Sequence, residues 1–337
     1  MSNARHFALA LIAGILTIGA PAPAQSYAYG SKTFLGFVKD SFREVRGNSS
    51  DFFQAFESSF KGVSGKTPSA FVDSVAQKLR TSKSESAKIQ AEIELGRDLH
   101  RFIKKSIPKF SLDRGFEFYQ TTRLGERQCF LQAVLIASLM QRAKVDAGVV
   151  MVYSNERGEL SNNGHAVTLV RLSAPLCLVV DASERHTFAT HRGLFVRWSK
   201  GGYKFLRPHY STGALPTFAA AGMQSAPVTV ALSDIQMLDV LFLKSQFDYY
   251  RGERAPNGFL AKKATPAGLA TSKRYLLRAT QLNSQNPLAV YILGRVEERL
   301  GEKSLAAKSY QNAIALYAKF GWTPGGVKES LARVTKA

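Results

Sequence analysis

Apolar residues at three- and four-residue spacing dominate the first part of the chain and predict helices there. Between residues 31 and 124 this spacing is clearest at 34–42 and at 71–79. Pro68 stands where a first helical turn accepts proline, and a long charged helix is expected from Ser84 to Lys105. We expect these helices to form a cap on the part that follows.

The pattern changes after residue 125. The stretch from Glu126 to Arg142 is apolar on almost every side after its first residues, which predicts a helix buried in a core. Short runs rich in valine and leucine follow, separated by turn residues, and predict antiparallel strands. These runs are 148–153, 165–172, 176–181, 194–198 and 203–206. A buried helix followed by such strands predicts an α+β fold.

The C-terminal third returns to helical spacing. A helix is expected from a Ser233 cap to about Tyr250. With Pro287 as the first position of a 34-residue unit, small and aromatic residues fall where the tetratricopeptide repeat has them. These residues are Gly294, Gly301, Ala306, Tyr310 and Ala313. The stretch therefore resembles one full tetratricopeptide repeat, preceded by the second helix of another, and an ordinary helical hairpin is the alternative.

The first 24 residues have the three-part order of a secretory signal. Arg5 precedes an apolar run from Phe7 to Ile18, and Ala22 and Ala24 form an A-x-A cleavage site that would leave Gln25 as the mature N-terminus. The run of about 12 residues is shorter than the roughly 20 needed to cross a bilayer. We expect a cleaved signal and a periplasmic or secreted protein, and an uncleaved anchor is the alternative.

Composition and charge limit the classes of function. The 337 residues are 45% hydrophobic and 21% charged, which argues against wholesale disorder and supports about two domains. A formal charge of +20 predicts attraction to polyanions, which outside the cell are anionic envelope polymers or lipid headgroups. The basic residues are spread along the chain rather than clustered in a stripe with interleaved aromatics, so a nucleic-acid partner is not expected.

Two cysteines, Cys129 and Cys177, are too few for a four-thiolate zinc site or a multi-bridge disulfide scaffold. Cys129 stands at the start of the predicted buried helix, where unpaired backbone donors and the positive end of the helix dipole favour a thiolate. On its position alone, a cysteine entering a core helix is more often a small core hydrophobe. Further residues have to decide between the two.

His165 begins one predicted strand and Asp181 ends the next. A turn centred near Ser173 would make them direct cross-strand neighbours, with backbones about 4.5 to 5.5 Å apart. A carboxylate beside an imidazole fixes its tautomer and orients it toward a third group. Cysteine, histidine and aspartate in this order therefore form a candidate catalytic triad.

The sequence resembles the transglutaminase-like superfamily, a branch of the papain-like cysteine enzymes, in three segments: GERQCFLQAVLIASLMQRAKVDAGVVMVY, NGHAVTLVRL and LCLVVDAS. They fall between about Phe110 and Pro208. The resemblance implies a papain-like or transglutaminase-like core of a buried helix and an antiparallel sheet. It implies that Cys129 is the nucleophile, His165 its base and acid, and Asp181 the orienting carboxylate. We expect no cofactor and no metal.

Two positions depart from the family's pattern. The residue after the cysteine, often tryptophan in the family, is Phe130. Arg123 stands six residues before the cysteine, where papain-like enzymes have an oxyanion glutamine, so the backbone N–H of Cys129 is the one oxyanion donor that we name.

Cys177 lies roughly 13 Å along the strand from Asp181 and is expected to be structural. A disulfide between Cys129 and Cys177 would exclude the triad.

Three further histidines, His186, His191 and His209, have no metal-ligand spacing and are expected on the surface or in loops. The chain then divides into four parts. They are a signal peptide at 1–24, a helical region at 25–109, a transglutaminase-like catalytic domain at 110–232 and a helical, tetratricopeptide-like domain at 233–337.

The leading hypothesis is an exported cysteine-dependent amide acyltransferase or hydrolase, in which Cys129 attacks a carboxamide or peptide carbonyl and forms a thioester. Water would resolve the thioester in a protease or deamidase, and a lysine amine would resolve it in a cross-linking enzyme. The C-terminal helices would bind a peptide or protein partner. The rival hypothesis is a non-catalytic binding or scaffold protein at the cell envelope, which uses the same helices and the basic surface.

Overall fold

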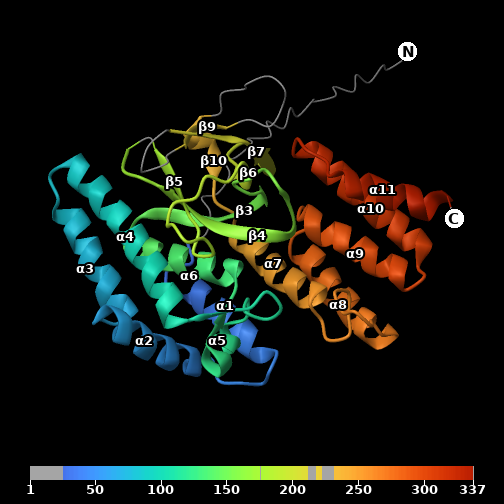
Figure 1. Cartoon of the computed structure of the whole chain (residues 1–337), viewed down its shortest axis with the longest axis horizontal. Helices are drawn as coiled ribbons and strands as arrows, with labels where there is room; N and C mark the ends of the chain where they lie inside the picture. Colours follow the sequence, from blue (N-terminus) through green and yellow to red (C-terminus); the bar gives the residue numbers. More distant parts are fainter. Residues whose placement is uncertain (1–25, 175, 212–217, 222–230, 337) are drawn as a thin grey trace, which may run out of the picture.

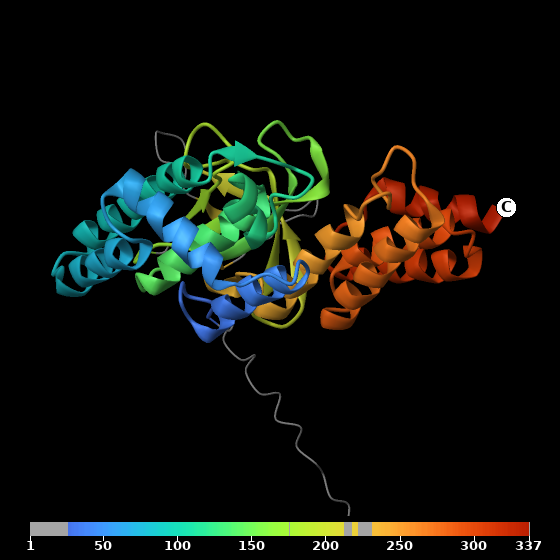
Figure 2. The same cartoon turned by 90° about the horizontal axis from the view of Figure 1, so that it is seen from below.

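The structure, a computed structural model, describes residues 26–174, 176–211, 218–221 and 231–336. The expected signal peptide and its cleavage site lie outside the described residues. The fold is mixed α+β, with an antiparallel sheet between N-terminal and C-terminal helices (Figure 1). The view from below shows the same succession along the long axis of the molecule (Figure 2).

The helices lie in three groups along the chain. The N-terminal helices are α1 (Lys32–Arg43), α2 (Ser50–Ser64), α3 (Pro68–Thr81), α4 (Glu85–Ser106) and α5 (Phe118–Leu124). The central helices are α6 (Cys129–Arg142) and α7 (Val240–Glu253). The C-terminal helices are α8 (Pro266–Leu282), α9 (Pro287–Arg299), α10 (Lys303–Lys319) and α11 (Gly325–Lys336).

The strands form one large sheet and one small one. The small parallel pair is β1 (Lys109–Phe110) with β2 (Glu126–Arg127). The large sheet contains β3 (Asp146–Ser154), β4 (Leu160–Arg171), β5 (Cys177–Val180), β6 (Gly193–Trp198), β7 (Tyr203–Leu206), β8 (Pro208–Tyr210), β9 (Phe218–Ala221) and β10 (Ile235–Gln236). Its order is β10-β6-β3-β4-β5-β9-β8, and β7 pairs with β6. All of its pairs are antiparallel, as the alternating runs predict.

The N-terminal helices begin and end close to the predicted positions. Ser31, Thr67 and Ser84 cap α1, α3 and α4, each with a side-chain oxygen that accepts from the backbone N–H three residues later. Aromatic side chains then hold these helices together. The ring of Phe52 on α2 lies 5.0 Å from that of Phe118 on α5, in edge-to-face contact. Such a pair contributes about 0.5 to 1.5 kcal/mol beyond the area that it buries.

Helix α6 is the centre of the core. Every residue from Cys129 to Met140 is buried, which agrees with the apolar pattern on all sides of this segment. The helix packs on β3 and β4 on one side and on α3 and α4 on another. On the sheet side, Thr168 Oγ1 donates a hydrogen bond to the carbonyl of Ala133, 3.1 Å away. A helix held from both sides keeps its first residue in a defined position.

The expected Ser233 cap is wrong. Ser233 lies in a short 3-10 turn, and β10 follows it and extends the large sheet by pairing with β6. Helix α7 begins only at Val240, because the side chain of Asp239 caps it by accepting from the N–H of Phe242 at 2.9 Å. The expected boundary at residue 233 therefore cuts through the sheet. Phe247 on α7 also packs against Phe130 on α6, so this helix belongs to the core.

The C-terminal helices α8 to α11 pack side by side at the far end of the molecule (Figure 2). The helices α9 and α10 contact each other closely at Gly294, where a Cβ would lie 2.8 Å from the ring of Tyr310. Ala306, Tyr310 and Ala313 are fully buried between the helices. Gly294, Ala306 and Ala313, three of the small residues that suggested a tetratricopeptide repeat, thus stand at a close helix–helix contact, whereas Gly301 is exposed in the turn after α9.

We expect Gly294→Ala to lower the free energy of unfolding by about 1 to 3 kcal/mol, because its Cβ would press against the Tyr310 ring. Gly62→Ala in α2 is the matched control. No atom lies within 4 Å of the place of its Cβ, so alanine should stabilise the helix by about 0.5 to 1 kcal/mol. Urea unfolding of both variants measures the difference. Equal effects would contradict the close packing of α9 on α10.

None of the helices formed by the described residues combines the length and the apolar character needed to span a membrane.

Candidate functional site

Cys129 is the first residue of α6, and the chain before it explains why. Gly125 ends α5 in the left-handed conformation, with φ of 64°. The strand β2 then pairs with β1, and Gln128 is extended, so the helix starts at the next residue. Cys129 is 5% exposed and is not in a disulfide. Its backbone N–H is in the first turn of the helix, where N–H groups have no intrahelical acceptor.

His165 lies where the pairing of β3 with β4 becomes irregular. Val152 pairs with His165 and Ser154 pairs with Leu160, so four residues of β4 stand opposite Tyr153 alone. Gly164 within this bulge has φ of 66°. A bulge bends the strand and changes the direction of the neighbouring side chain. His165 is thereby placed against both other members of the expected triad.

The predicted register of β4 with β5 is wrong by two residues. The ladder pairs Thr168 with Val180, which places Asp181 opposite Val167 rather than His165. A shift of two residues keeps a side chain on the same face of the sheet, whereas a shift of one would reverse it. His165 and Asp181 are therefore diagonal neighbours, and His165 Nε2 still lies 2.7 Å from Asp181 Oδ2.

Cys129 is the third member of this group. Its charge and a side-chain interaction with it are among the causes that raise the pKa of His165, so the two side chains lie close together. Because Nε2 bonds to Asp181, a bond to the sulfur would be made by Nδ1. The structure thus brings Cys129, His165 and Asp181 together in the expected order. A base between a thiol and a carboxylate is the arrangement that activates a cysteine nucleophile.

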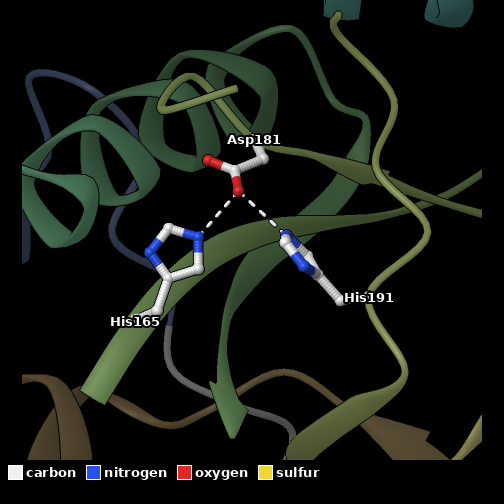
Figure 3. A group of neighbouring side chains, drawn as sticks. All are labelled: His165, Asp181 and His191. Atoms are coloured by element: carbon white, nitrogen blue, oxygen red, sulfur yellow. Dashed lines mark hydrogen bonds and ion pairs between the residues drawn. The ribbon is translucent and has the colours of Figure 1, made fainter. Parts of the chain in front are cut away.

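A second histidine, His191, also binds Asp181. Figure 3 shows the rings of His165 and His191 converging on one carboxylate oxygen of Asp181. His191 Nε2 lies 2.9 Å from Oδ2, and the N–H of Ser183 donates to Oδ1 at 2.8 Å. The carboxylate therefore accepts three hydrogen bonds, which hold its orientation.

His191 was expected on the surface or in a loop; it lies in a loop, but it is not on the surface. His191 is 1% exposed, and its loop between β5 and β6 folds back over the end of β5. His186 and His209 are exposed, and His186 contacts Glu156. No spacing in the sequence distinguishes His191 from these two, because its contact with Asp181 depends on the path of an irregular loop.

The electrostatics of the pair follow from its burial and its contacts. Burial alone would lower the pKa of His165, but the charges of Asp181 and Cys129 and hydrogen bonds to both raise this pKa well above its ordinary value. Burial would raise the pKa of Asp181, but the charge of His165 and hydrogen bonds from both histidines hold this pKa far below its usual range. Both shifts favour a charged imidazolium beside a carboxylate.

His165, Asp181 and His191 also form a group that could hold a metal ion, since one ligand atom of each lies within 4.8 Å of the others. The sequence offered no signal for it. The same atoms already make the two hydrogen bonds to Asp181, at 2.7 and 2.9 Å. A metal bound there would take Nε2 of His165 away from Asp181. This group is therefore better suited to orienting an imidazole than to holding a resident metal.

Cys177 lies away from the triad, paired with Arg171 in the ladder of β4 and β5. It is 1% exposed, and burial raises the pKa of its thiol to about 11. A thiol with such a pKa is protonated near neutral pH and is a poor nucleophile. Both cysteines are free, so no disulfide opposes the triad.

The two departures from the family's pattern have clear positions. Arg123 is exposed and stacks on the ring of Tyr119, so it is not an oxyanion donor. Phe130 is fully buried, and its ring packs against the rings of Phe247 and Tyr250 on α7. Phe130 is thus a core contact between α6 and α7.

Tyr250 is a neighbour of the site that the sequence did not indicate. It is fully buried, and its hydroxyl donates to the carbonyl of Gly164, next to His165. Burial and the charge of Cys129 raise the pKa of Tyr250 well above its ordinary value. A neutral hydroxyl can therefore fix the bulge that positions His165.

We expect Asp181→Asn to cost the most stability at mildly acidic pH. Because the pKa of Asp181 is lowered in the folded protein, its charged form adds to the free energy of unfolding above about pH 4. This addition is lost as the pH falls through the lowered pKa. Because the pKa of His165 is raised, its contribution is present below about pH 6.5 and is lost as the pH rises through the raised value. The loss should be about 1.5 to 3 kcal/mol near pH 5.5 and should shrink toward pH 10.

Urea unfolding across this range measures the effect. Asp73→Asn is the matched control, because Asp73 forms a more exposed ion pair with Arg142, which stays charged throughout. Its cost should stay below about 1 kcal/mol and should not change with pH. A cost of Asp181→Asn that is equally independent of pH would contradict a charged His165–Asp181 pair.

Comparisons with known proteins identify no family. No protein-family model matches the chain, and no curated protein matches it. Among solved structures, a crystal structure of menin that reveals the binding site for the Mixed Lineage Leukemia protein is 12% identical over 85% of this chain, with a TM-score of 0.38. This chain spans 62% of that menin chain. A likeness at this level carries no argument about function.

Proposed function

We propose that this protein is a cysteine-dependent amide acyltransferase or hydrolase with a transglutaminase-like core. The observation that supports the proposal most strongly is the position of His165. Its Nε2 lies 2.7 Å from Asp181 Oδ2, and the nearby Cys129 also raises its pKa. The burial of Asp181 and its second histidine partner strengthen the argument. A carboxylate at 1% exposure needs such partners, and here they also orient the imidazole.

The chemistry follows from these atoms. The Cys129 sulfur attacks the carbonyl carbon of an amide, a C–S bond forms, and the carbonyl electrons move to the oxygen. The backbone N–H of Cys129 donates to that oxygen. The C–N bond then breaks, His165 gives its proton to the leaving nitrogen, and a thioester remains on Cys129. Water or an amine then loses a proton to His165 and attacks the thioester carbon. The C–S bond breaks, a carboxylic acid or an amide leaves, and the Cys129 thiolate is restored.

Asp181 is a positioning residue in this scheme. It holds the Nε2–H of His165 and stabilises the imidazolium, while His191 and Ser183 hold Asp181 itself. The proposal leaves the second substrate open: water gives a protease or deamidase, and a lysine amine gives a cross-linking enzyme.

Export of the protein is part of the proposal. The order of charged, apolar and small residues in 1–24 supports it. Removal of this segment takes away Arg5, its only charged residue apart from histidine, and leaves a formal charge of +19. A charge of this sign would favour substrates attached to anionic envelope polymers or membrane surfaces. A groove of tetratricopeptide-like helices would recruit a peptide or protein.

The test is a pH profile of thiol labelling. Iodoacetamide should label Cys129 readily below about pH 7, because a thiolate paired with an imidazolium reacts there. His165→Ala should move the labelling profile toward higher pH, whereas Cys177 should stay unlabelled in the folded protein. The labelled residue is identified by mass spectrometry.

A labelling profile that is the same with and without His165 would reject the catalytic proposal. That result would favour the binding or scaffold protein, in which Cys129 is a core residue and His165 has no influence on it.

A further inference from the structure

A small aromatic cavity lies between the end of the large sheet and the C-terminal helices. Its volume is about 80 Å³, and its walls include Met151, Phe205, Leu288, Tyr291, Tyr317 and Trp322. The first two come from the sheet, and the other four come from α9, α10 and the segment before α11. Leu288, Tyr291 and Trp322 are half-buried, so they stand at the edge of the cavity.

The cavity reaches the residue next to the candidate catalytic base. Gly164 is part of its wall, and His165 is the following residue. A Cβ on Gly164 would lie 3.0 Å from Leu288 Cδ2 and 3.3 Å from Met151 Cε. Gly164 thus leaves this part of the wall without a side chain, and the backbone leads directly from it to His165. Tyr250 holds this part of the chain by donating to the Gly164 carbonyl.

One buried polar group in the wall lacks a full set of partners. Gln246 is completely buried, and its Oε1 accepts from Asn286 Nδ2 at 3.2 Å. Among the described residues, its Nε2 has no acceptor at hydrogen-bonding geometry. The hydroxyl of Tyr250 is its neighbour. The amide has two N–H groups, and one hydroxyl oxygen there can accept from at most one of them. At least one buried N–H is left, and such a group ordinarily costs about 1 to 3 kcal/mol.

We infer that this cavity is the substrate subsite of the enzyme, taking an aromatic or branched apolar side chain of the peptide that Cys129 attacks. Gln246 would donate its remaining N–H to a carbonyl of the same peptide. The inference rests on the proposed function, since it assigns a substrate class to that site. It also gives the C-terminal helices a direct role, because they supply most of the rim.

The size of the cavity favours one side chain over a whole ligand. Pockets that hold a drug-sized molecule or a cofactor have roughly 300 to 1,000 Å³, several times the 80 Å³ found here. The aromatic walls favour an apolar group, because no charged side chain lines the cavity among the described residues. A peptide anchored by one apolar side chain, with its reactive carbonyl near Cys129, fits both facts.

The experiment measures labelling of Cys129 in the whole protein by three N-acetyl dipeptide chloromethyl ketones, Phe-Gly, Gly-Phe and Gly-Gly. In each, the thiolate forms a C–S bond with the methylene carbon, and the C–Cl bond breaks with loss of chloride. One of the two phenylalanine reagents should label at least about tenfold faster than Gly-Gly. Iodoacetamide, which has no side chain to bind, serves as the reference for thiol reactivity.

Leu288→Trp should fill the cavity and reduce the preference for phenylalanine to about twofold or less. Leu305→Trp is the matched control, because Leu305 is exposed on α10 and outside the cavity. It should keep the full preference. If Leu288→Trp does not fold, Trp322→Ala provides a second variant, which enlarges the cavity and should favour a naphthylalanine reagent over the phenylalanine reagent.

Equal labelling by the phenylalanine and glycine reagents, or a preference that survives Leu288→Trp, would overturn the subsite. Failure of the proposed function looks different, since iodoacetamide labelling would then not depend on His165. In that case the cavity is tested without any reaction, by measuring whether N-acetyl-phenylalanine amide binds to the protein. Binding that Leu288→Trp removes would support an aromatic site, and no binding would reject it.

Discussion

Replacing Cys129 with alanine is expected to abolish amine incorporation, ammonia release and peptide cleavage in assays with a denatured, glutamine-rich protein. In the proposed mechanism the sulfur is the atom that forms the thioester, so no other group replaces it. His165→Ala should lower kcat by about 10⁴-fold, because the variant loses both the base for the thiol and the acid for the leaving nitrogen. Circular dichroism should show an unchanged fold in both variants.

Cys177→Ser is the matched control for the nucleophile. Cys177 is also buried and free, yet it lies on β5 and has no histidine partner. Serine there should cost some packing energy and leave kcat unchanged. Activity that persists in Cys129→Ala, or that disappears in a folded Cys177→Ser, would contradict the assignment of the nucleophile.

His191 separates positioning from chemistry. His191→Phe keeps a planar ring of somewhat larger size but removes the hydrogen bond to Asp181. We expect a moderate loss of kcat together with a shift of the acidic limb of the pH profile, because Asp181 loses a group that lowers its pKa. A merely structural histidine would change stability and leave the pH profile in place.

Arg251→Met is expected to be the most destabilising of the variants considered, with a loss of about 3 to 5 kcal/mol in the free energy of unfolding. Arg251 on α7 binds both oxygens of Glu117, at 2.6 and 2.9 Å, and Asp248 at 2.8 Å. All three side chains are buried. Methionine would fill much of the space but would leave the Glu117 carboxylate buried without its main partner.

Arg333→Met provides the matched control, since Arg333 binds Glu298 through two hydrogen bonds of similar length on a more exposed surface. Its loss should stay below about 1 kcal/mol. The double variant Arg251→Met with Glu117→Gln should regain part of the stability, because the unpaired charge is gone. Urea unfolding measures the free energy of unfolding of the three variants and of the unchanged protein. Equal losses for Arg251→Met and Arg333→Met would show that burial does not make loss of the Arg251 pair more costly in free energy of unfolding.

The local elements of this protein and the chain order of the candidate triad follow from short stretches of sequence. Helix α4 begins after Ser84, as predicted, because a serine oxygen and the apolar spacing act within a few residues. The strands β3 to β7 follow their alternating or continuous apolar runs for the same reason. Cys129 at a helix start and Asp181 at a strand end are consequences of these local patterns.

The details that join these elements depend on how the elements pack together. The register of β4 with β5 differs by two residues from the expected one, because the connection closes where the N–H of Leu172 donates to the carbonyl of Leu176, one residue later than a turn centred near Ser173 would. Asp239 rather than Ser233 caps α7, since β10 first completes the sheet. Neither outcome is contained in a short window of sequence.

The same holds for the partners of the site. His191, Tyr250 and the Arg251–Glu117 pair depend on contacts between residues that are 10 to 134 positions apart. Periodicity reports which face of a helix or strand is buried, but not what lies opposite that face. The residues opposite a buried face are set when all the elements pack into one core. There each buried polar group must find a hydrogen-bond partner. A cavity remains where the neighbouring side chains do not fill the space.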